Sequence, residues 1–344
     1  MTKKRILETL KILLFVGIGV GIIFWFWKGL AQEDKDRFWA SIQQANYLWL
    51  GVSLLIGALS HYSRALRWGI LLEPTGHFPK KYNLFFAVMN MYFFNMAVPR
   101  LGEVTRCVSL QTYEKVPFEK SFGTVISERA VDVIILGLFF AIAFIFNLQE
   151  AKEIWSNITS MMNSNSPTAE KSFWAENLKF ILVGGGVIVF GILYLLRNNS
   201  FVSKVYFKVM AVLKGFWDGM KSVFYVKRPL SFTFHSLFIW FLYYMMTYVC
   251  FLSIPETAGL SLNVVLLVFC FGSIAIAVVP GGIGIYPVFV SIVLASPTLG
   301  GIDKGVGLAL GWIIWTAQTI MILLLGIITL ILQPIVNRNK HAKV

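Results

Sequence analysis

The sequence predicts an all-α polytopic membrane protein, and three observations lead to that fold class. The chain of 344 residues is 57% hydrophobic and 14% charged, whereas soluble domains carry about 25% charged residues. Long apolar runs recur and are separated by short polar or basic segments. Two interruptions, a charged stretch at 99–106 and a glycine-rich turn at 280–284, lie within apolar surroundings. Charge and broken backbone are costly at membrane depth, so this pattern indicates an internal polar site.

Each predicted span rests on a run of roughly 20 apolar residues, the length that crosses a bilayer as a helix. The first span lies at about 9–28 and the second at about 47–72. Between them, the polar stretch 33–46 is expected to form an interfacial helix. The apolar segments that follow lie at about 82–98, 118–146, 177–197, 230–253, 262–279, 285–296 and 305–333.

A basic amphipathic helix is predicted within 198–228. At about 100° per residue, its lysines and its apolar side chains fall on opposite sides of a helical wheel. The lysines are Lys204, Lys208, Lys214 and Lys221, and the apolar residues are Val205, Val209, Leu213, Phe216 and Met220. Such a helix lies on an anionic membrane surface, and a plain cytoplasmic linker with solvated lysines is the alternative.

The positive-inside rule sets the orientation, because basic loops stay in the cytoplasm. It places the N-terminal segment 1–8, the segment 198–228 and the tail 334–344 in the cytoplasm. The polar segment 147–177 is not rich in basic residues and is expected to form an external loop. The chain is therefore predicted to be a multi-pass protein of the cytoplasmic (inner) membrane, with both termini cytoplasmic.

A first re-entrant hairpin reconciles this orientation with the number of apolar segments. If 82–98 crossed the membrane completely, the basic segment 198–228 would lie outside, against the positive-inside rule. The conflict disappears if 82–112 enters and leaves on the cytoplasmic side, with its turn at Pro99 and Gly102. That arrangement leaves about six full spans.

A second hairpin, entering from the outside, is predicted at 262–296 with its turn at Pro280. Two hairpins from opposite faces resemble an inverted repeat, in which broken helices place a site near the membrane midplane. Gly281, Gly282 and Gly284 permit close backbone approach at this turn. The amides that follow can receive an anion, and a tight turn that needs glycine for steric reasons is the equal alternative.

The charged residues within these apolar surroundings are predicted to give an internal cavity with a positive balance of charge. In the first hairpin they recur every three positions, so one helical face presents them together. On the next helix, charges at i,i+3 and i,i+4 are neighbours. With two arginines of the second span, they are Arg64, Arg67, Arg100, Glu103, Arg106, Glu128, Arg129 and Asp132. Five positive and three negative charges leave a net charge of +2, which suits an anionic group such as a lipid phosphate.

Simpler interpretations exist for some of these residues. Arg67, near the end of its span, is expected to snorkel to lipid headgroups rather than to bind substrate. A second simple interpretation is that the charges form structural clamps that hold no ligand, in pairs such as Arg100–Glu128 and Arg106–Asp132. We favour a functional role for the group as a whole, since ionisable residues within a membrane usually serve function.

The sequence contains no pattern that predicts catalysis, a cofactor or a metal. It has no Walker motif, no HExxH and no nucleophile elbow. Cys107, Cys250 and Cys270 lie far apart in or beside apolar segments and are expected to be packing residues, as is His61. The basic residues flank apolar spans, so the net charge of +13 follows the positive-inside rule, and no nucleic-acid partner is expected.

Four segments resemble the membrane domain of the lysylphosphatidylglycerol synthetase and flippase-like family. They read RALRW at 64–68, VPRLGEVTR at 98–106, SERAVD at 127–132 and PGGIG at 280–284. The resemblance covers nearly the whole chain and includes no soluble aminoacyl-transferase domain. It departs at Pro287, where the family often has an acidic residue. The resemblance implies a role in moving or handling lipid or lipid-linked glycan in the cytoplasmic membrane of a prokaryote.

The sequence therefore predicts a flippase-like transporter that moves an anionic phospholipid or a lipid-linked glycan across the cytoplasmic membrane. The residues expected to build its substrate site are Arg64, Arg100, Glu103, Arg106, Glu128, Arg129, Asp132, Gly281, Gly282 and Gly284. The carboxylates would orient the arginines or take up protons. Two alternatives stay open: a lipid- or glycan-modifying membrane enzyme or its accessory subunit, and a structural partner in envelope biogenesis. A homo-oligomer is also left open.

Overall fold

The computed structural model describes four stretches of the chain and a few isolated positions. The stretches are residues 26–98, 100–147, 221–299 and 301–338. Every regular element within them is a helix and none is a strand, as the all-α prediction requires. The predicted first span, the external loop, the span after that loop and the basic amphipathic segment lie largely outside the described residues.

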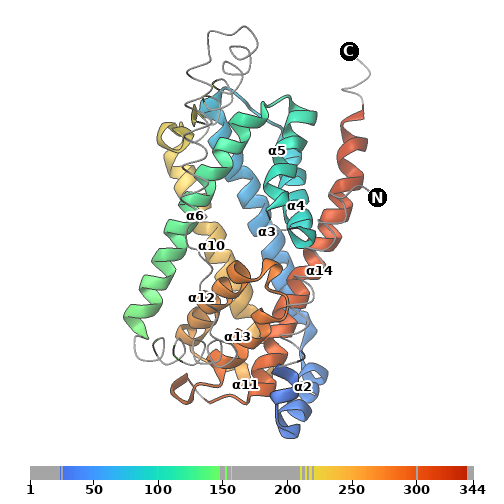
Figure 1. Ribbon diagram of the computed structural model, residues 1–344, viewed down its shortest axis with the longest axis vertical. Coiled ribbons are helices and arrows are strands. Elements are labelled where there is room, and N and C mark those ends of the chain that lie inside the picture. The colour runs from blue at the N-terminus through green and yellow to red at the C-terminus, as the bar shows by residue number, and fades with distance from the viewer. Residues whose placement is uncertain are drawn as a thin grey trace, which may run out of the picture.

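Four long helices run along the long axis of the molecule and form its frame (Figure 1). They are α3 (Tyr47–Leu72), α6 (Phe118–Phe146), α10 (Pro229–Phe251) and α14 (Lys304–Val336). Each of these helices begins and ends within three residues of the bounds predicted for its span, because the apolar runs stop at polar residues or prolines. Three of them, α6, α10 and α14, are long and apolar enough to cross a membrane. The chain is therefore a membrane-embedded, multi-pass protein.

A first helix pair consists of α4 (Lys81–Ala97) and α5 (Leu101–Glu114), which pack antiparallel. Gly102, the second residue of α5, lets the two helices touch. Its amide donates to Oδ1 of Asn95 at 2.7 Å, and a Cβ at this position would overlap the carbonyl oxygen of Met91. The helices have 17 and 14 residues. They are about 20–26 Å long, shorter than the roughly 30 Å of a bilayer core.

A second helix pair consists of α12 (Leu262–Val278) and α13 (Ile285–Leu294), with the 3-10 helix η3 (Pro280–Gly282) at its turn. These helices, of 17 and 10 residues, are also shorter than the roughly 20 residues that cross a bilayer. A left-handed backbone makes glycine necessary at the turn. The φ angles lie between 68° and 76° at Gly281, Gly282 and Gly284.

The two helix pairs occupy opposite halves of the molecule, and their turns meet near its middle (Figure 1). η3 of the second pair packs against α4 of the first. Nε1 of Trp315 on α14 donates to the carbonyl oxygen of Gly281 at 2.7 Å. At the open end of the first pair, Nδ2 of Asn83 donates to a carboxylate oxygen of Glu114. The first helix pair therefore begins and ends at one end of the molecule, and the second pair begins and ends at the opposite end.

The remaining helices close the two ends of the frame. The predicted helix at 33–46 is confirmed as α2 (Gln32–Gln44), which packs on the start of α14. Arg37 of α2 pairs with Asp303 at 3.5 Å. The amide of Asn46 donates to the carbonyl oxygen of Ser253 at 2.7 Å. The other short elements are η1 (Glu73–Thr75), η2 (Ser222–Tyr225), α11 (Pro255–Ala258) and η4 (Pro297–Leu299).

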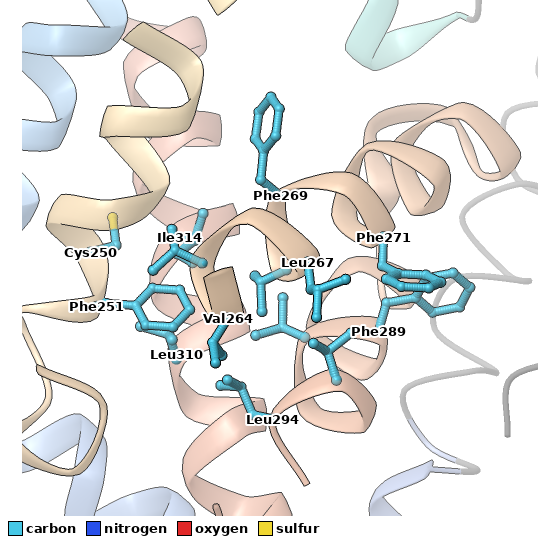
Figure 2. Packing of buried hydrophobic residues seen from close by; sticks show 14 of the residues in the cluster. Cys250, Phe251, Val264, Leu267, Phe269, Phe271, Phe289, Leu294, Leu310 and Ile314 are labelled. Carbon is cyan, nitrogen blue, oxygen red and sulfur yellow. The ribbon is translucent and has the colours of Figure 1, made fainter. Parts of the chain in front are cut away.

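A large apolar core fills the half of the molecule around the second helix pair (Figure 2). Phe251 of α10, Leu267 of α12, Phe289 of α13 and Leu310 of α14 are buried in it. A smaller apolar cluster lies between α3 and the first helix pair. The three cysteines are buried and unpaired, which agrees with their predicted packing role.

A polar seam joins the first helix pair to α14, and we call it the α14 seam. Oε1 of Gln333 accepts from Nδ2 of Asn90 at 2.9 Å, while Nε2 of Gln333 donates to Oγ of Ser109 at 2.7 Å. Just past the end of α14, Nδ2 of Asn337 donates to Oδ1 of Asn83 at 2.8 Å. All five side chains are buried, so the seam provides the hydrogen bonds that buried polar groups require.

Candidate functional site

Seven charged side chains meet between α3, α5 and α6, and we call them the charge cluster. They are Arg64 and Arg67 of α3, Glu103 and Arg106 of α5, and Glu128, Arg129 and Asp132 of α6. Residues three or four apart lie on one face of a helix, so each helix turns its charges toward the other two. Four arginines against three carboxylates leave one positive charge.

Glu128 lies at the centre of the charge cluster. Its Oε1 accepts from Nη1 of Arg64 at 2.6 Å and from Nη2 of Arg67 at 3.2 Å. Its Oε2 accepts from Nη2 of Arg106 at 2.9 Å. Glu128, Arg67 and Arg106 are completely buried. Charge-assisted hydrogen bonds of this kind offset the cost of burying each charge, so removal of one partner is strongly unfavourable.

Asp132 completes the inner part of the cluster, one turn further along α6. Its Oδ1 accepts from Nη2 of Arg67 at 2.8 Å, and its Oδ2 accepts from Nη1 of Arg64 at 2.7 Å. Nε1 of Trp240 on α10 also reaches Oδ1 at 3.4 Å. Both oxygens of Asp132 therefore have close donors, and the contact with Trp240 brings a fourth helix to the site.

Arg106 is held against an aromatic ring as well as against Glu128. Its guanidinium carbon lies 4.5 Å from the centroid of the Trp68 ring, within range of a cation–π interaction. Nε1 of Trp68 in turn donates to Oγ1 of Thr124 on α6 at 2.9 Å. These contacts fix the guanidinium of α5 between α3 and α6.

An outer ion pair forms the accessible edge of the charge cluster. Nη2 of Arg129 donates to Oε1 of Glu103 at 3.0 Å, and its Nη1 lies 3.7 Å from Oδ2 of Asp132, the predicted i,i+3 partner. The side chain of Arg129 is 38% exposed and that of Glu103 is 19% exposed, whereas the inner charges are at most 8% exposed. Arg129 is therefore the most exposed arginine of the charge cluster.

The buried arginines have more donors than the neighbouring acceptors satisfy. Four buried guanidinium nitrogens make no hydrogen bond to any of the described residues. They are Nε of Arg64, Nε of Arg67, and Nε and Nη1 of Arg106. Buried polar groups without a partner in a protein interior need an explanation. A group that offers only acceptor oxygens, such as a phosphate, complements this surplus of donors.

The position predicted for Arg67 was wrong, and the alternative clamp pairs are not the pairs that form. Arg67 does not snorkel to headgroups: it is fully buried and donates to Glu128 and Asp132, because α3 turns it toward α6. Arg100 is exposed at the start of α5 with φ of 64° and makes no ion pair with another described residue. The alternative Arg100–Glu128 clamp is therefore absent, and Arg106 pairs with Glu128 instead of Asp132.

The predicted glycines lie at the turn of the second helix pair. No described hydrogen bond or ion pair joins them to the charge cluster. Gly282 and Gly284 are buried, and Gly281 accepts from Trp315. Of the predicted site residues, the structure thus brings six charged ones together with Arg67 and leaves Arg100 and the three glycines outside the cluster.

Aromatic residues beside the cluster were not predicted from the sequence. The ring centroids of His61 and Tyr92 are 4.2 Å apart, which agrees with the packing role expected of His61. The hydroxyl groups of Tyr92 and Tyr243 are 2.9 Å apart, and the Tyr243 ring lies 6.0 Å from the Arg64 guanidinium carbon. Aromatic residues make up 15% of the chain, so composition gave no signal that distinguished these. The described residues contain no group of acidic, histidine or cysteine side chains that fits a metal ion.

Comparison with known proteins identifies the family. No curated protein and no solved structure gives a significant match to the chain. A family model described as lysylphosphatidylglycerol synthase TM region matches residues 10–326, a range that includes the whole charge cluster and both helix pairs. The chain therefore belongs to the family of lysylphosphatidylglycerol synthase transmembrane regions, a family of membrane proteins with lipid-related roles.

Proposed function

We propose that the chain translocates an anionic phospholipid or lipid-linked glycan across the cytoplasmic membrane and that the charge cluster binds the phosphate. The observation that carries this proposal is a group of four arginines and three carboxylates, mostly buried, in which several buried arginine donors make no hydrogen bond. Ionisable residues at membrane depth usually mark a substrate or ion pathway. The cluster's single excess positive charge matches one phosphodiester, which carries a single negative charge.

The two helix pairs support a site that both sides of the membrane can reach. Their helices are shorter than the roughly 20 residues of a typical span, and each pair starts and finishes at one end of the molecule. We infer that they are re-entrant hairpins that enter from opposite faces, with their turns near the midplane. Broken helices of this kind surround the substrate sites of several transporter folds, where alternating access moves protein around a fixed site.

The distribution of charge at the two ends supports the orientation. At the open end of the first helix pair, basic residues outnumber acidic ones by seven to three in the segments 73–81, 114–120 and 221–228. At the opposite end the count is four basic to five acidic in the segments 28–46, 252–261 and 295–304. The positive-inside rule then makes the first hairpin cytoplasmic and the second external.

Arg129 provides the contact that an incoming phosphate reaches first. It is the only partly exposed arginine of the charge cluster among the described residues. Arg64 and Arg106 lie behind it, and their positions are fixed by Glu128 and Asp132. Arg100, exposed at the turn of the first hairpin, is placed to attract the headgroup before it binds.

Reconstitution into vesicles tests this function. We expect the wild-type chain to move fluorescent phosphatidylglycerol between leaflets faster than fluorescent phosphatidylcholine. Arg129→Gln should lower the rate of phosphatidylglycerol movement by about tenfold or more, because a hydrogen bond to a charged group is worth roughly 1.5–3 kcal/mol. Arg37→Gln, which alters an exposed ion pair at the far end, is the matched control and should retain wild-type rates. If vesicles with the wild-type chain moved phosphatidylglycerol no faster than protein-free vesicles, translocation of this anionic phospholipid would be refuted.

One observation favours a second candidate, a structural partner in envelope biogenesis. All four oxygens of Glu128 and Asp132 already have close donors, as a packing clamp requires. The two roles differ at Arg129, which adds little to a clamp because it is the most exposed member. Under the structural role, Arg129→Gln leaves both stability and lipid movement unchanged.

A further inference from the structure

The charge cluster has two layers that differ in burial and in hydrogen bonding. The inner layer consists of Arg64, Arg67, Arg106, Glu128 and Asp132, with side-chain exposures between 0% and 8%. The outer layer is the Arg129–Glu103 pair, with exposures of 38% and 19%. Screening by solvent makes a partly exposed ion pair weaker than a buried one. The outer pair is therefore the easiest part of the cluster to separate.

The hydrogen bonds of Glu103 show that the outer pair is incomplete. Oε1 of Glu103 accepts from Arg129 at 3.0 Å, but its Oε2 is buried and has no partner among the described residues. The strongest contact between an arginine and a carboxylate uses both oxygens. Arg129 instead turns its other nitrogen toward Asp132, at 3.7 Å. An anion that offers two oxygens to Arg129 can form a better contact than Glu103 does.

The inner carboxylates cannot exchange in the same way. Glu128 accepts from three arginines, and Asp132 accepts from two. Their removal from these partners would leave several buried positive charges without compensation. Glu103 has one arginine partner, so its displacement frees one guanidinium and leaves the inner layer intact.

We propose that Glu103 competes with the substrate phosphate for Arg129, so that the phosphate displaces Glu103 when it binds. This inference rests on the proposed function and assigns Glu103 the part of an internal competitor rather than a substrate ligand. The displaced carboxylate belongs to α5 and Arg129 belongs to α6, so the exchange removes one ion pair between the first helix pair and α6. The Arg106–Glu128 pair still joins the same two helices.

The competition has a distinctive consequence, because removal of a negative charge at Glu103 should strengthen binding. In Glu103→Gln, the neutral amide keeps the size of the side chain but loses most of its attraction to Arg129. We expect short-chain phosphatidylglycerol to bind the detergent-purified full chain about two- to fivefold more tightly in this variant, the range that a partly exposed ion pair can account for. Glu119→Gln, in the first turn of α6 and outside the cluster, is the matched control.

Titration of wild type, Glu103→Gln, Arg129→Gln and the double variant tests the inference, with short-chain phosphatidylcholine as the reference lipid. The double variant should bind as weakly as Arg129→Gln. Unchanged or weaker binding by Glu103→Gln would overturn the competition while leaving the proposed function intact, provided that Arg129→Gln loses binding. Equal binding of both lipids by the wild type would overturn the proposed function and the inference together. Inorganic phosphate that binds as tightly as phosphatidylglycerol would assign the site to a free ion and overturn the lipid assignment.

Discussion

Arg106 of α5 donates from Nη2 to Oε2 of Glu128 on α6 at 2.9 Å, and both side chains are completely buried. This contact joins the first helix pair to a helix long enough to cross the membrane. Because Glu128 also accepts from two arginines of α3, one carboxylate connects three helices. The position of the first helix pair therefore depends on charge as well as on apolar packing.

Glu128→Gln should lower the thermal stability of the purified chain severely. Three arginines would then surround a neutral amide, and loss of one partner of a buried ion pair costs about 3–5 kcal/mol. Thermal unfolding followed in detergent measures the effect. Glu119→Gln makes the same chemical change outside the charge cluster and should leave the midpoint unchanged. Equal midpoints for the two variants would show that Glu128 does not hold the helices together.

Gly102→Ala should destabilise the first helix pair, since the added Cβ would overlap the carbonyl oxygen of Met91. Overpacking of this kind costs about 1–3 kcal/mol. Gly137→Ala is the control, because a Cβ at that position in α6 meets no other atom within 4 Å. It should maintain or raise stability, as alanine favours helix. A wild-type unfolding midpoint for Gly102→Ala would contradict the close helix contact.

Gln333→Leu should weaken the α14 seam and with it the attachment of the first helix pair. The leucine would leave Asn90 and Ser109 without their partner, and each unsatisfied buried group costs about 1–3 kcal/mol. The expected result is a lower unfolding midpoint. Thr316→Leu, on an exposed position of the same helix, should have little effect. If both variants unfold alike, the seam contributes nothing to stability.

Cysteine labelling tests the predicted hairpins. Single cysteines in place of Lys80 and Lys115 flank the first helix pair, and cysteines in place of Gly259 and Thr298 flank the second. With the native cysteines replaced, an impermeant maleimide should label the first two positions only from the cytoplasm. It should label the other two only from outside. External labelling at the Lys115 position, with Lys80 still cytoplasmic, would mean that the first pair crosses the membrane completely.

The sequence predicted helices well and contacts between helices only in part. The bounds of α3 and α6 agree with the predicted spans because apolar runs, prolines and polar residues mark both ends of these helices. Helical periodicity also predicted that Glu103 and Arg106 share a face, but Arg100 precedes the first residue of α5 with a left-handed backbone and does not share it. Periodicity could not predict that Arg67 points to Glu128, because the rotation of each helix is set by its packing against the others. The aromatic neighbours of the cluster were missed for the same reason.

Identification of the lipids that co-purify with the chain in mild detergent, by mass spectrometry, tests the lipid site most directly. Wild type and Arg129→Gln should be purified side by side, because this substitution removes the accessible arginine and keeps the buried part of the cluster. We expect one anionic lipid to be enriched in the wild type over its share of the membrane and to lose that enrichment in the variant. Identical profiles that match the bulk membrane in both samples would contradict an anionic lipid site at the charge cluster.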